Sequence, residues 1–341
     1  MKAVYLPGNK RVEIRAVEVP TPRADEVLVQ VKASCICRSD MSLYYGGDAT
    51  VGGEAAGRCI TGHEPAGIVV EVGAAVTQFR SGDRVAVYLA VGCGTCEYCR
   101  QGSMFLCPQW TCLGFTQDGG NAEYLAVPAR NLLRIPDSMS FVAAAISTDA
   151  FGTLYSASRK LGIDGSKTVG IWGLGPMGSA GTLAAKALGG RVVTFDPIEE
   201  RRRFSLELGA DLALDPTDPA SLATLKDFTQ GHGLDRAIDC SGNGGAQNMA
   251  LDALAPFGQL ACVGESRETT IRPSEQLIRK QVTIFGSWYF NIAEYPEITR
   301  VIEAKNIDLE RLATHRFALD DAETAFRMFD ERRTEKAVFV M

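Results

Sequence analysis

Histidine is scarce in this chain of 341 residues, which contains only His63, His232 and His315. Any chemistry that needs an imidazole therefore has few candidates. Basic residues are also outnumbered, because 35 Lys and Arg face 41 Asp and Glu, for a formal net charge of −6. This acidic balance disfavours nucleic acid and anionic membranes as main partners.

Long apolar runs, internal repeats and low-complexity segments are missing as well. No stretch approaches 18 consecutive apolar residues, and the first ten residues, MKAVYLPGNK, contain no apolar core of a signal peptide. We therefore expect a cytoplasmic protein. With 46% hydrophobic and 22% charged residues the composition is globular. The length suggests about two domains.

Cysteine, by contrast, is abundant, with ten residues in the chain. Four of them follow the pattern C-x2-C-x2-C-x7-C within CGTCEYCRQGSMFLC: Cys93, Cys96, Cys99 and Cys107. Four thiolates at this spacing close a tetrahedral zinc shell, which predicts a structural zinc lobe over residues 92–108. The alternative is a set of buried thiols without metal. Disulfides are not expected in a reducing compartment.

The sequence pattern changes near residue 150. Before it, short runs separated by Gly- and Pro-rich turns predict a barrel-like β domain, with strands within 10–19, 26–34, 66–73 and 83–90. After it, strands and helices alternate, which predicts a doubly wound parallel sheet. Its expected strands are 168–172, 191–195, 234–240, 258–264 and 281–288, and its expected helices are 176–190, 199–210 and 244–254. Helices near 294–304 and 320–331 and a last strand at 336–341 form a short tail that can return to the first domain.

A glycine-rich hexapeptide, GLGPMG at 173–178, follows one of these strands and opens a helix. In a dinucleotide site Gly173 would make the tight turn, Gly175 would let the pyrophosphate approach the backbone, and Gly178 would allow close helix–strand packing. Asp196, eighteen residues after Gly178, would accept hydrogen bonds from the ribose hydroxyls. The alternative is an ordinary glycine-rich turn with a chance aspartate. Pro176 and Met177 complete the loop.

Candidates for a second metal site are scattered along the chain. The segment ASCICRSD at 33–40 offers Cys35 or Cys37 as a thiolate ligand, and TGHEPAG supplies His63 and Glu64. A lone histidine is more often a packing residue than a ligand, but here it occurs together with a nucleotide loop and a four-cysteine lobe. The residues alone leave open which cysteine is the ligand.

In order along the chain, CRSD (37–40), GHE (62–64), the four-cysteine lobe and GLGPMG resemble the zinc-dependent medium-chain alcohol and polyol dehydrogenases. The resemblance covers essentially the whole chain. It implies an α/β protein with a GroES-like β-barrel catalytic domain over 1–149 and 290–341, and a Rossmann NAD-binding domain over 150–289. It also implies an oxidoreductase with NAD, one catalytic and one structural zinc, a small-molecule alcohol or ketone substrate, and a homo-oligomer, either a tetramer or a dimer.

The resemblance also implies roles for the residues around Cys37. This cysteine, directly before Arg-Ser-Asp, matches the ligand cysteine, and His63 matches the ligand histidine. Ser39 matches the hydroxyl that accepts the proton of the substrate alcohol. Asp40 matches the carboxylate that orients His63. Arg38 matches a residue that contacts the cofactor pyrophosphate.

The third zinc ligand differs from that of the simple-alcohol branch. Where many relatives carry a second cysteine, this chain has STDAFGTLYSA, in which the matching residue is Asp149. Thr153, four residues later, matches a hydroxyl near the nicotinamide. Asp149 could instead be a helix N-cap, and Glu64 could exchange onto the zinc. Arg201, five residues after Asp196, could reach the adenosine end of the cofactor.

A carboxylate third ligand resembles the polyol and threonine dehydrogenase branches of the family. We therefore expect oxidation of a secondary alcohol on a polyhydroxylated substrate. The alternatives are a threonine-type or simple secondary-alcohol dehydrogenase, or, in a different class, a catalytically silent binding or scaffold protein. Ser42 stands where many relatives have a relay histidine. The proton's route past Ser39 is therefore open between the cofactor ribose, Ser42 and water.

Overall fold

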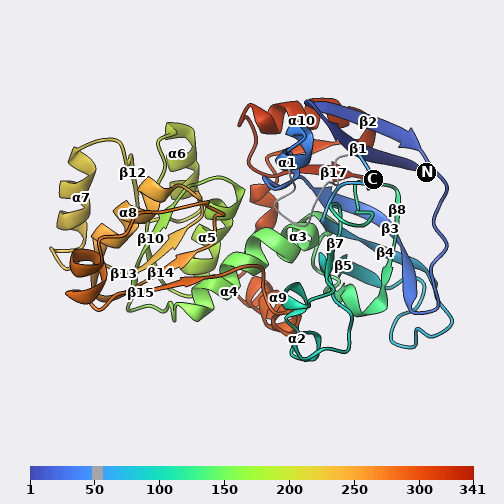
Figure 1. Ribbon diagram of the computed structural model, residues 1–341, viewed down its shortest axis with the longest axis horizontal. Helices are drawn as coiled ribbons and strands as arrows, with labels where there is room; N and C mark the ends of the chain where they lie inside the picture. The colour runs from blue at the N-terminus through green and yellow to red at the C-terminus, as the bar shows by residue number, and fades with distance from the viewer. Residues whose placement is uncertain (48–56) are drawn as a thin grey trace. The chain divides into compact units, whose positions relative to one another are not determined.

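The computed structural model describes residues 1–47 and 57–341, which form two compact units (Figure 1). The first unit comprises Met1–Asp149, Asn291–Arg300 and Asp308–Met341, and the second comprises Ala150–Phe290 and Val301–Ile307. The sequence prediction assigned all of 290–341 to the first domain. The structure instead groups Phe290 and residues 301–307 with the second unit, and the boundary at Arg300 falls inside helix α9 (Tyr295–Ala304).

The main sheet of the first unit has the strand order β16-β17-β3-β4-β5-β9, and β8 pairs with β3. Two smaller sheets are the β1–β2 hairpin and the β6–β7 pair. The strands are β1 (Lys2–Gly8), β2 (Arg11–Ala16), β3 (Glu26–Cys35), β4 (Glu64–Val72), β5 (Arg84–Val87), β6 (Ala90–Val91), β7 (Thr111–Cys112), β8 (Tyr124–Pro128), β9 (Leu132–Arg134), β16 (His315–Phe317) and β17 (Ala337–Val340).

Short helices complete the first unit. They are α1 (Asp40–Tyr45), α2 (Glu97–Arg100), α3 (Phe141–Ile146) and α10 (Ala322–Asp330), with the 3₁₀ turns η1 (Met104–Leu106), η2 (Ala129–Asn131), η5 (Ile292–Glu294), η6 (Leu309–Leu312) and η7 (Leu319–Asp321). The core depends on β3, whose valines at alternate positions, Val27, Val29 and Val31, are buried in one hydrophobic cluster. This period of two is the pattern from which the strand over 26–34 was predicted.

The second unit contains a six-stranded parallel sheet in the order β12-β11-β10-β13-β14-β15, which is the Rossmann order (Figure 1). Its strands are β10 (Thr168–Trp172), β11 (Arg191–Phe195), β12 (Leu212–Leu214), β13 (Leu234–Asp239), β14 (Leu254–Cys262) and β15 (Thr283–Gly286). Its helical segments are α4 (Gly152–Lys160), α5 (Pro176–Ala187), α6 (Glu199–Glu207), α7 (Ala220–Phe228), α8 (Gly244–Ala253) and the π-helical η4 (Pro273–Ile278). Helix α5 packs on β10 and β11, and α8 packs on β13 and β14.

The predicted fold class is confirmed, but several elements escaped the sequence analysis. The helical run from Phe141 to Lys160 is the largest of these. Nearly all of its residues from 142 to 158 are buried, so the sequence shows no one-sided apolar stripe from which to predict a helix. The predicted strand 83–90 is divided into β5, which pairs with β9, and β6, which pairs with β7. In the described part of the chain no helix is both long and apolar enough to span a membrane.

Candidate functional site

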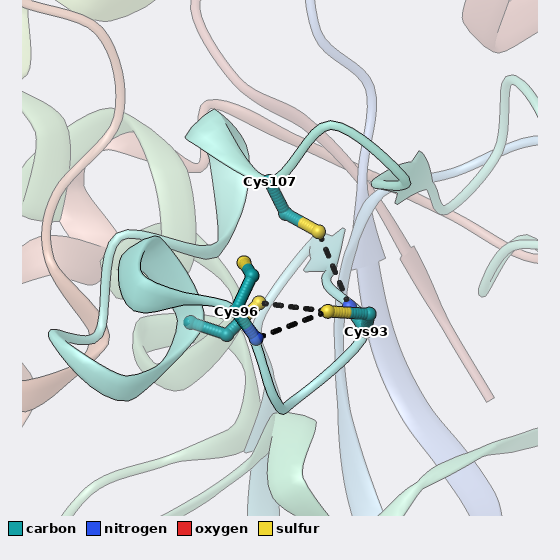
Figure 2. A group of neighbouring side chains, drawn as sticks. Cys93, Cys96 and Cys107 are labelled. Atoms are coloured by element: carbon teal, nitrogen blue, oxygen red, sulfur yellow. Dashed lines mark hydrogen bonds between the residues drawn. The ribbon is translucent and has the colours of Figure 1, made fainter.

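The four cysteines of the lobe converge at a single point. Strand β6 leads into Cys93, α2 carries Cys99 and follows Cys96, and η1 ends just before Cys107. Their four sulfur atoms all lie within 4.8 Å of one another. Figure 2 shows Cys93, Cys96 and Cys107 gathered in this way. Within residues 1–47 and 57–341 no cysteine forms a disulfide.

Hydrogen bonds to sulfur prepare this lobe for a metal. Backbone N–H groups of Thr95 and Cys96 donate to Cys93 Sγ at 3.5 and 3.4 Å, and the N–H of Gln109 donates to Cys107 Sγ at 3.4 Å. The Thr95 hydroxyl and the N–H groups of Thr95 and Cys96 lower the pKa of Cys93 to about 5. Burial raises the pKa of Cys99 to about 12, and a bound metal ion would favour its thiolate. The donor set fits a four-coordinate structural zinc.

A second cluster contains Cys37, His63, Glu64 and Asp149, all of them buried. One ligand atom from each lies within 4.8 Å of the others. Pairing of β3 with β4 brings three of these residues together, because Cys35 at the end of β3 is the register partner of Glu64. Cys37 then follows β3 by two residues, and His63 directly precedes β4.

Asp149 supplies the remaining carboxylate of this second cluster. Its Oδ2 atom lies 3.6 Å from Cys37 Sγ and 3.5 Å from His63 Nε2. The alternative that Asp149 is a helix N-cap is wrong, because it lies inside the π-helical turn Ser147–Phe151, with α3 before it and α4 after it. Ser140 is the residue that caps α3. π-helical turns inside α-helices are frequent at functional sites.

Asp40 fixes the orientation of the imidazole. One of its carboxylate oxygens accepts a hydrogen bond from the Cys37 N–H at 2.8 Å, and the other lies 3.2 Å from His63 Nδ1. With Nδ1 held by Asp40, Nε2 faces Asp149 and is the nitrogen that could bind a metal. Burial lowers the pKa of His63, but the charges and hydrogen bonds of Asp40 and Asp149 outweigh it and raise that pKa well above its ordinary value.

Glu64 lies in the cluster, but it has a partner that the sequence analysis missed. Its Oε1 atom lies 3.9 Å from His63 Nε2 and forms a salt bridge with the ammonium group of Lys336. Neither side chain is exposed to solvent. Burial raises the pKa of Glu64 to about 7 despite the opposing positive charge of Lys336. A lysine directly before the final strand carries no sequence signal for burial, which is why it was overlooked.

The other residues to which the sequence analysis gave a role near the cluster differ in their burial and hydrogen bonds. Ser39 is half-buried at the start of α1, and its hydroxyl does not cap that helix. Ser42 Oγ donates to the backbone oxygen of Ser39 at 2.8 Å rather than to its hydroxyl. Arg38 is exposed, and Thr153 is buried on α4 in the second unit.

The glycine loop has the geometry of a dinucleotide site. Gly173 has a φ of +83°, and a Cβ on Gly178 would lie 1.9 Å from Gly173 O, so neither position tolerates a side chain. A Cβ on Gly175 would meet only the guanidinium of Arg201, at 3.8 Å or more. The chain itself therefore does not require a glycine at 175, but a pyrophosphate against the start of α5 would. Pro176 and Met177 are the first residues of α5.

Asp196 lies at the end of β11 beside this loop. Its Oδ2 accepts a hydrogen bond from Leu174 N–H at 2.8 Å, and its Oδ1 accepts one from Ile198 N–H at 2.9 Å. Each carboxylate oxygen can accept a second hydrogen bond, so ribose hydroxyls can still be bound. Arg201 Nη1 lies 3.8 Å from Asp196 Oδ2. The end of β11 and the start of α6 thus place a negative and a positive group beside the glycine loop.

Two family models match the chain. The alcohol dehydrogenase GroES-like domain matches residues 23–137, and the zinc-binding dehydrogenase model matches residues 176–304. The chain belongs to the zinc-dependent medium-chain dehydrogenase family. The dehydrogenase is therefore an oxidoreductase of the alcohol dehydrogenase type, with the GroES-like and Rossmann folds that the sequence predicted.

Curated relatives match the dehydrogenase over nearly its whole length. An uncharacterized zinc-type alcohol dehydrogenase-like protein of Escherichia coli, YphC, is 33% identical over 99% of this chain and 98% of its own. Sorbitol dehydrogenase of Bacillus subtilis is 32% identical, with 95% and 92% of the two chains covered. L-threonine 3-dehydrogenase of Pyrococcus horikoshii is 31% identical, with 96% and 95% covered.

Solved structures of similar proteins contain either nicotinamide cofactor. An alcohol dehydrogenase from Escherichia coli CFT073 in complex with NADH is 28% identical, with a TM-score of 0.90 and coverage of 100% and 99%. A putative zinc-binding dehydrogenase from Sinorhizobium meliloti bound to NADP is 25% identical, with a TM-score of 0.86 and the same coverage. Proteins of similar structure thus bind one or the other of the two cofactors.

Proposed function

We propose that this dehydrogenase oxidises a secondary alcohol of a polyol or sugar-derived substrate to a ketone, with NAD as the hydride acceptor. The observation that carries the proposal is the carboxylate of Asp149 beside Cys37 Sγ and His63 Nε2. A cysteine, a histidine and one carboxylate suit a catalytic zinc with an open fourth position. Sorbitol dehydrogenase and threonine 3-dehydrogenase are among the relatives, in line with a carboxylate third ligand.

The residues of the first unit have complementary tasks in this proposal. A zinc ion held by Cys37, His63 and Asp149 would polarise the substrate hydroxyl and lower its pKa. Ser39 is proposed to receive the hydroxyl proton, a role for which its hydroxyl is available because it does not cap α1. Asp40 keeps the Nε2 lone pair of His63 directed at the cluster.

The proton leaves Ser39 through water or the cofactor ribose in this scheme. Ser42, the third candidate, already donates its hydroxyl hydrogen to the backbone oxygen of Ser39. Its oxygen can still accept a proton from the Ser39 hydroxyl, but its own hydrogen points to a backbone carbonyl oxygen that cannot pass a proton on. A relay through Ser42 therefore requires this hydrogen to turn away from the carbonyl oxygen.

NAD is the proposed cofactor, and it supplies the redox chemistry when bound. The open space above Gly175 suits the pyrophosphate, to which Arg38 of the first unit is proposed to donate. Asp196 is proposed to bind the adenosine ribose hydroxyls. Thr153 is proposed to contribute its hydroxyl near the nicotinamide. A second zinc in the four-cysteine lobe has a structural role in this proposal.

A substrate panel tests the proposal. The zinc-loaded protein is assayed with NAD on polyols, cyclitols, threonine and simple secondary alcohols by following NADH absorbance, with Cys37→Ser as the inactive control. We expect kcat/KM to be at least ~10-fold higher for a polyol or cyclitol than for the other classes. A preference for threonine would favour the threonine dehydrogenase alternative. Zinc-loaded protein that turns over no alcohol would favour the silent binding protein.

A further inference from the structure

Lys336 is a buried lysine that the proposed function does not use. It directly precedes β17, and its N–H donates to Leu312 O at 3.0 Å. The strand register explains its place, because Val338 on β17 pairs with Cys35 on β3, and Cys35 pairs with Glu64 on β4. The three strands thus bring the ammonium group of Lys336 to the carboxylate of Glu64.

The Lys336–Glu64 pair is incomplete by itself. Both side chains have no solvent exposure, and burying two charges is costly unless all their hydrogen-bonding positions are satisfied. Lys336 occupies Glu64 Oε1, whereas the buried Oε2 atom has no hydrogen-bond partner among the residues that the structure describes. An orphaned carboxylate oxygen inside a cluster of metal-binding groups indicates that a further positive group completes it.

The charges of the cluster show what Lys336 changes. Two positive charges on a zinc ion would be balanced by the thiolate of Cys37 and the carboxylate of Asp149. Glu64 adds a third negative charge to the cluster, and the ammonium group of Lys336, paired with Glu64 Oε1, balances this charge. Glu64 can therefore be ionised whether it binds the metal or only Lys336.

We propose that Lys336 is a positioning residue that competes with the metal for the carboxylate of Glu64 and so keeps one metal position open for the substrate. This inference rests on the proposed function, because it requires a zinc at Cys37, His63 and Asp149. Without the ammonium group, Glu64 binds the metal as a fourth ligand and the substrate has to displace it. Lys336 acts through Glu64 and does not touch the reacting atoms.

The test uses protein in which cobalt replaces zinc and imidazole is the probe of the open metal position. Changes in the visible cobalt spectrum on addition of imidazole report its binding. Subtracting the spectrum without imidazole removes the absorption of cobalt in the four-cysteine site, which imidazole does not change. The variants are Lys336→Met, which keeps the length of the side chain but removes its charge, Glu64→Gln, and the double variant. Lys280→Met is the matched control, since Lys280 is a half-buried lysine that donates to Leu251 O, Asp252 O and Leu254 O in the second unit.

The proposal predicts a coupled result. Lys336→Met weakens imidazole binding at least ~10-fold, as expected if the open form falls to about a tenth of the population. In the Glu64→Gln background the same substitution changes imidazole binding by less than ~3-fold, which is under 1 kcal/mol. The control variant binds imidazole like the wild type. Unchanged binding in Lys336→Met, or a double variant as weak as Lys336→Met, would overturn the proposal.

Two further measurements keep this test decisive. If Lys336→Met does not fold, Lys336→Arg replaces it: a guanidinium can bind both Glu64 oxygens, so imidazole should bind at least as tightly as in the wild type. Binding ~10-fold weaker in that variant would contradict the proposal.

Wild-type protein that takes up no cobalt at Cys37 would refute both the proposed function and this inference. Cobalt uptake and alcohol turnover with no effect of Lys336→Met would refute the inference alone.

Discussion

Cofactor preference should depend on the balance between Asp196 and Arg201. NADP would bring a phosphate toward the Asp196 carboxylate, and two unit charges ~4 Å apart repel by about 1 kcal/mol in water and about 4 kcal/mol at an effective dielectric constant near 20. Arg201 offsets part of this repulsion, because its Nη1 atom lies 3.8 Å from Asp196 Oδ2. We expect a net preference for NAD of at least ~10-fold in kcat/KM, equivalent to about 1.4 kcal/mol.

The ratio of kcat/KM with NAD to that with NADP is the appropriate readout. Asp196→Ser leaves the N–H groups of Leu174 and Ile198 without their carboxylate partner, which weakens the loop for both cofactors. The ratio cancels this shared loss. It should fall in Asp196→Ser, because Arg201 then acts unopposed on the phosphate, and it should rise in Arg201→Ala.

Arg203→Ala is the control, since Arg203 is an exposed arginine of the same helix. Its ratio should match that of the wild type. A wild type that used both cofactors equally, or an Asp196→Ser variant with an unchanged ratio, would show that the aspartate does not bind the ribose.

Three more substitutions test the metal sites. Cys37→Ser should abolish turnover and remove about one zinc per chain, whereas Cys35→Ser should retain both metals; zinc loss from the Cys35 variant in metal analysis would reverse the assignment. Cys96→Ser should lower the melting temperature, because a four-thiolate zinc contributes on the order of 10 kcal/mol in small peptides; a normal melting curve with full zinc content would contradict this. Asp149→Asn should weaken zinc binding and turnover by ~10-fold or more, and unchanged values would make Glu64 the better third-ligand candidate.

The features that the sequence predicted best are local ones. The four-cysteine lobe and the glycine loop each lie within a short segment, so residue spacing alone determines which atoms meet. The parallel sheet was also recognisable, because most of its strands are short apolar runs that alternate with helices, although the three-residue β12 (Leu212–Leu214) was missed. The helices around Asp149 were missed because the segment is buried on all sides and shows no amphipathic period.

The second cluster could not be derived from spacing. Cys37 and Asp149 are 112 residues apart in sequence, and they meet because α3, which leads into the π-helical turn, packs on β3. The resemblance to a family suggested these residues, but it gave no distances. Lys336 is further still from Glu64, by 272 residues, and only the pairing of β17 with β3 explains its burial.

The central claim is that Cys37, His63 and Asp149 bind the zinc ion that activates the substrate alcohol. Anomalous diffraction at the zinc absorption edge, from crystals of the zinc-loaded dehydrogenase, tests it most directly. The account predicts a peak about 2.3 Å from Cys37 Sγ and about 2.0–2.2 Å from His63 Nε2 and an Asp149 oxygen, in addition to the peak in the four-cysteine lobe. A peak in the lobe alone, or a second peak that Asp149 does not contact, would contradict the claim.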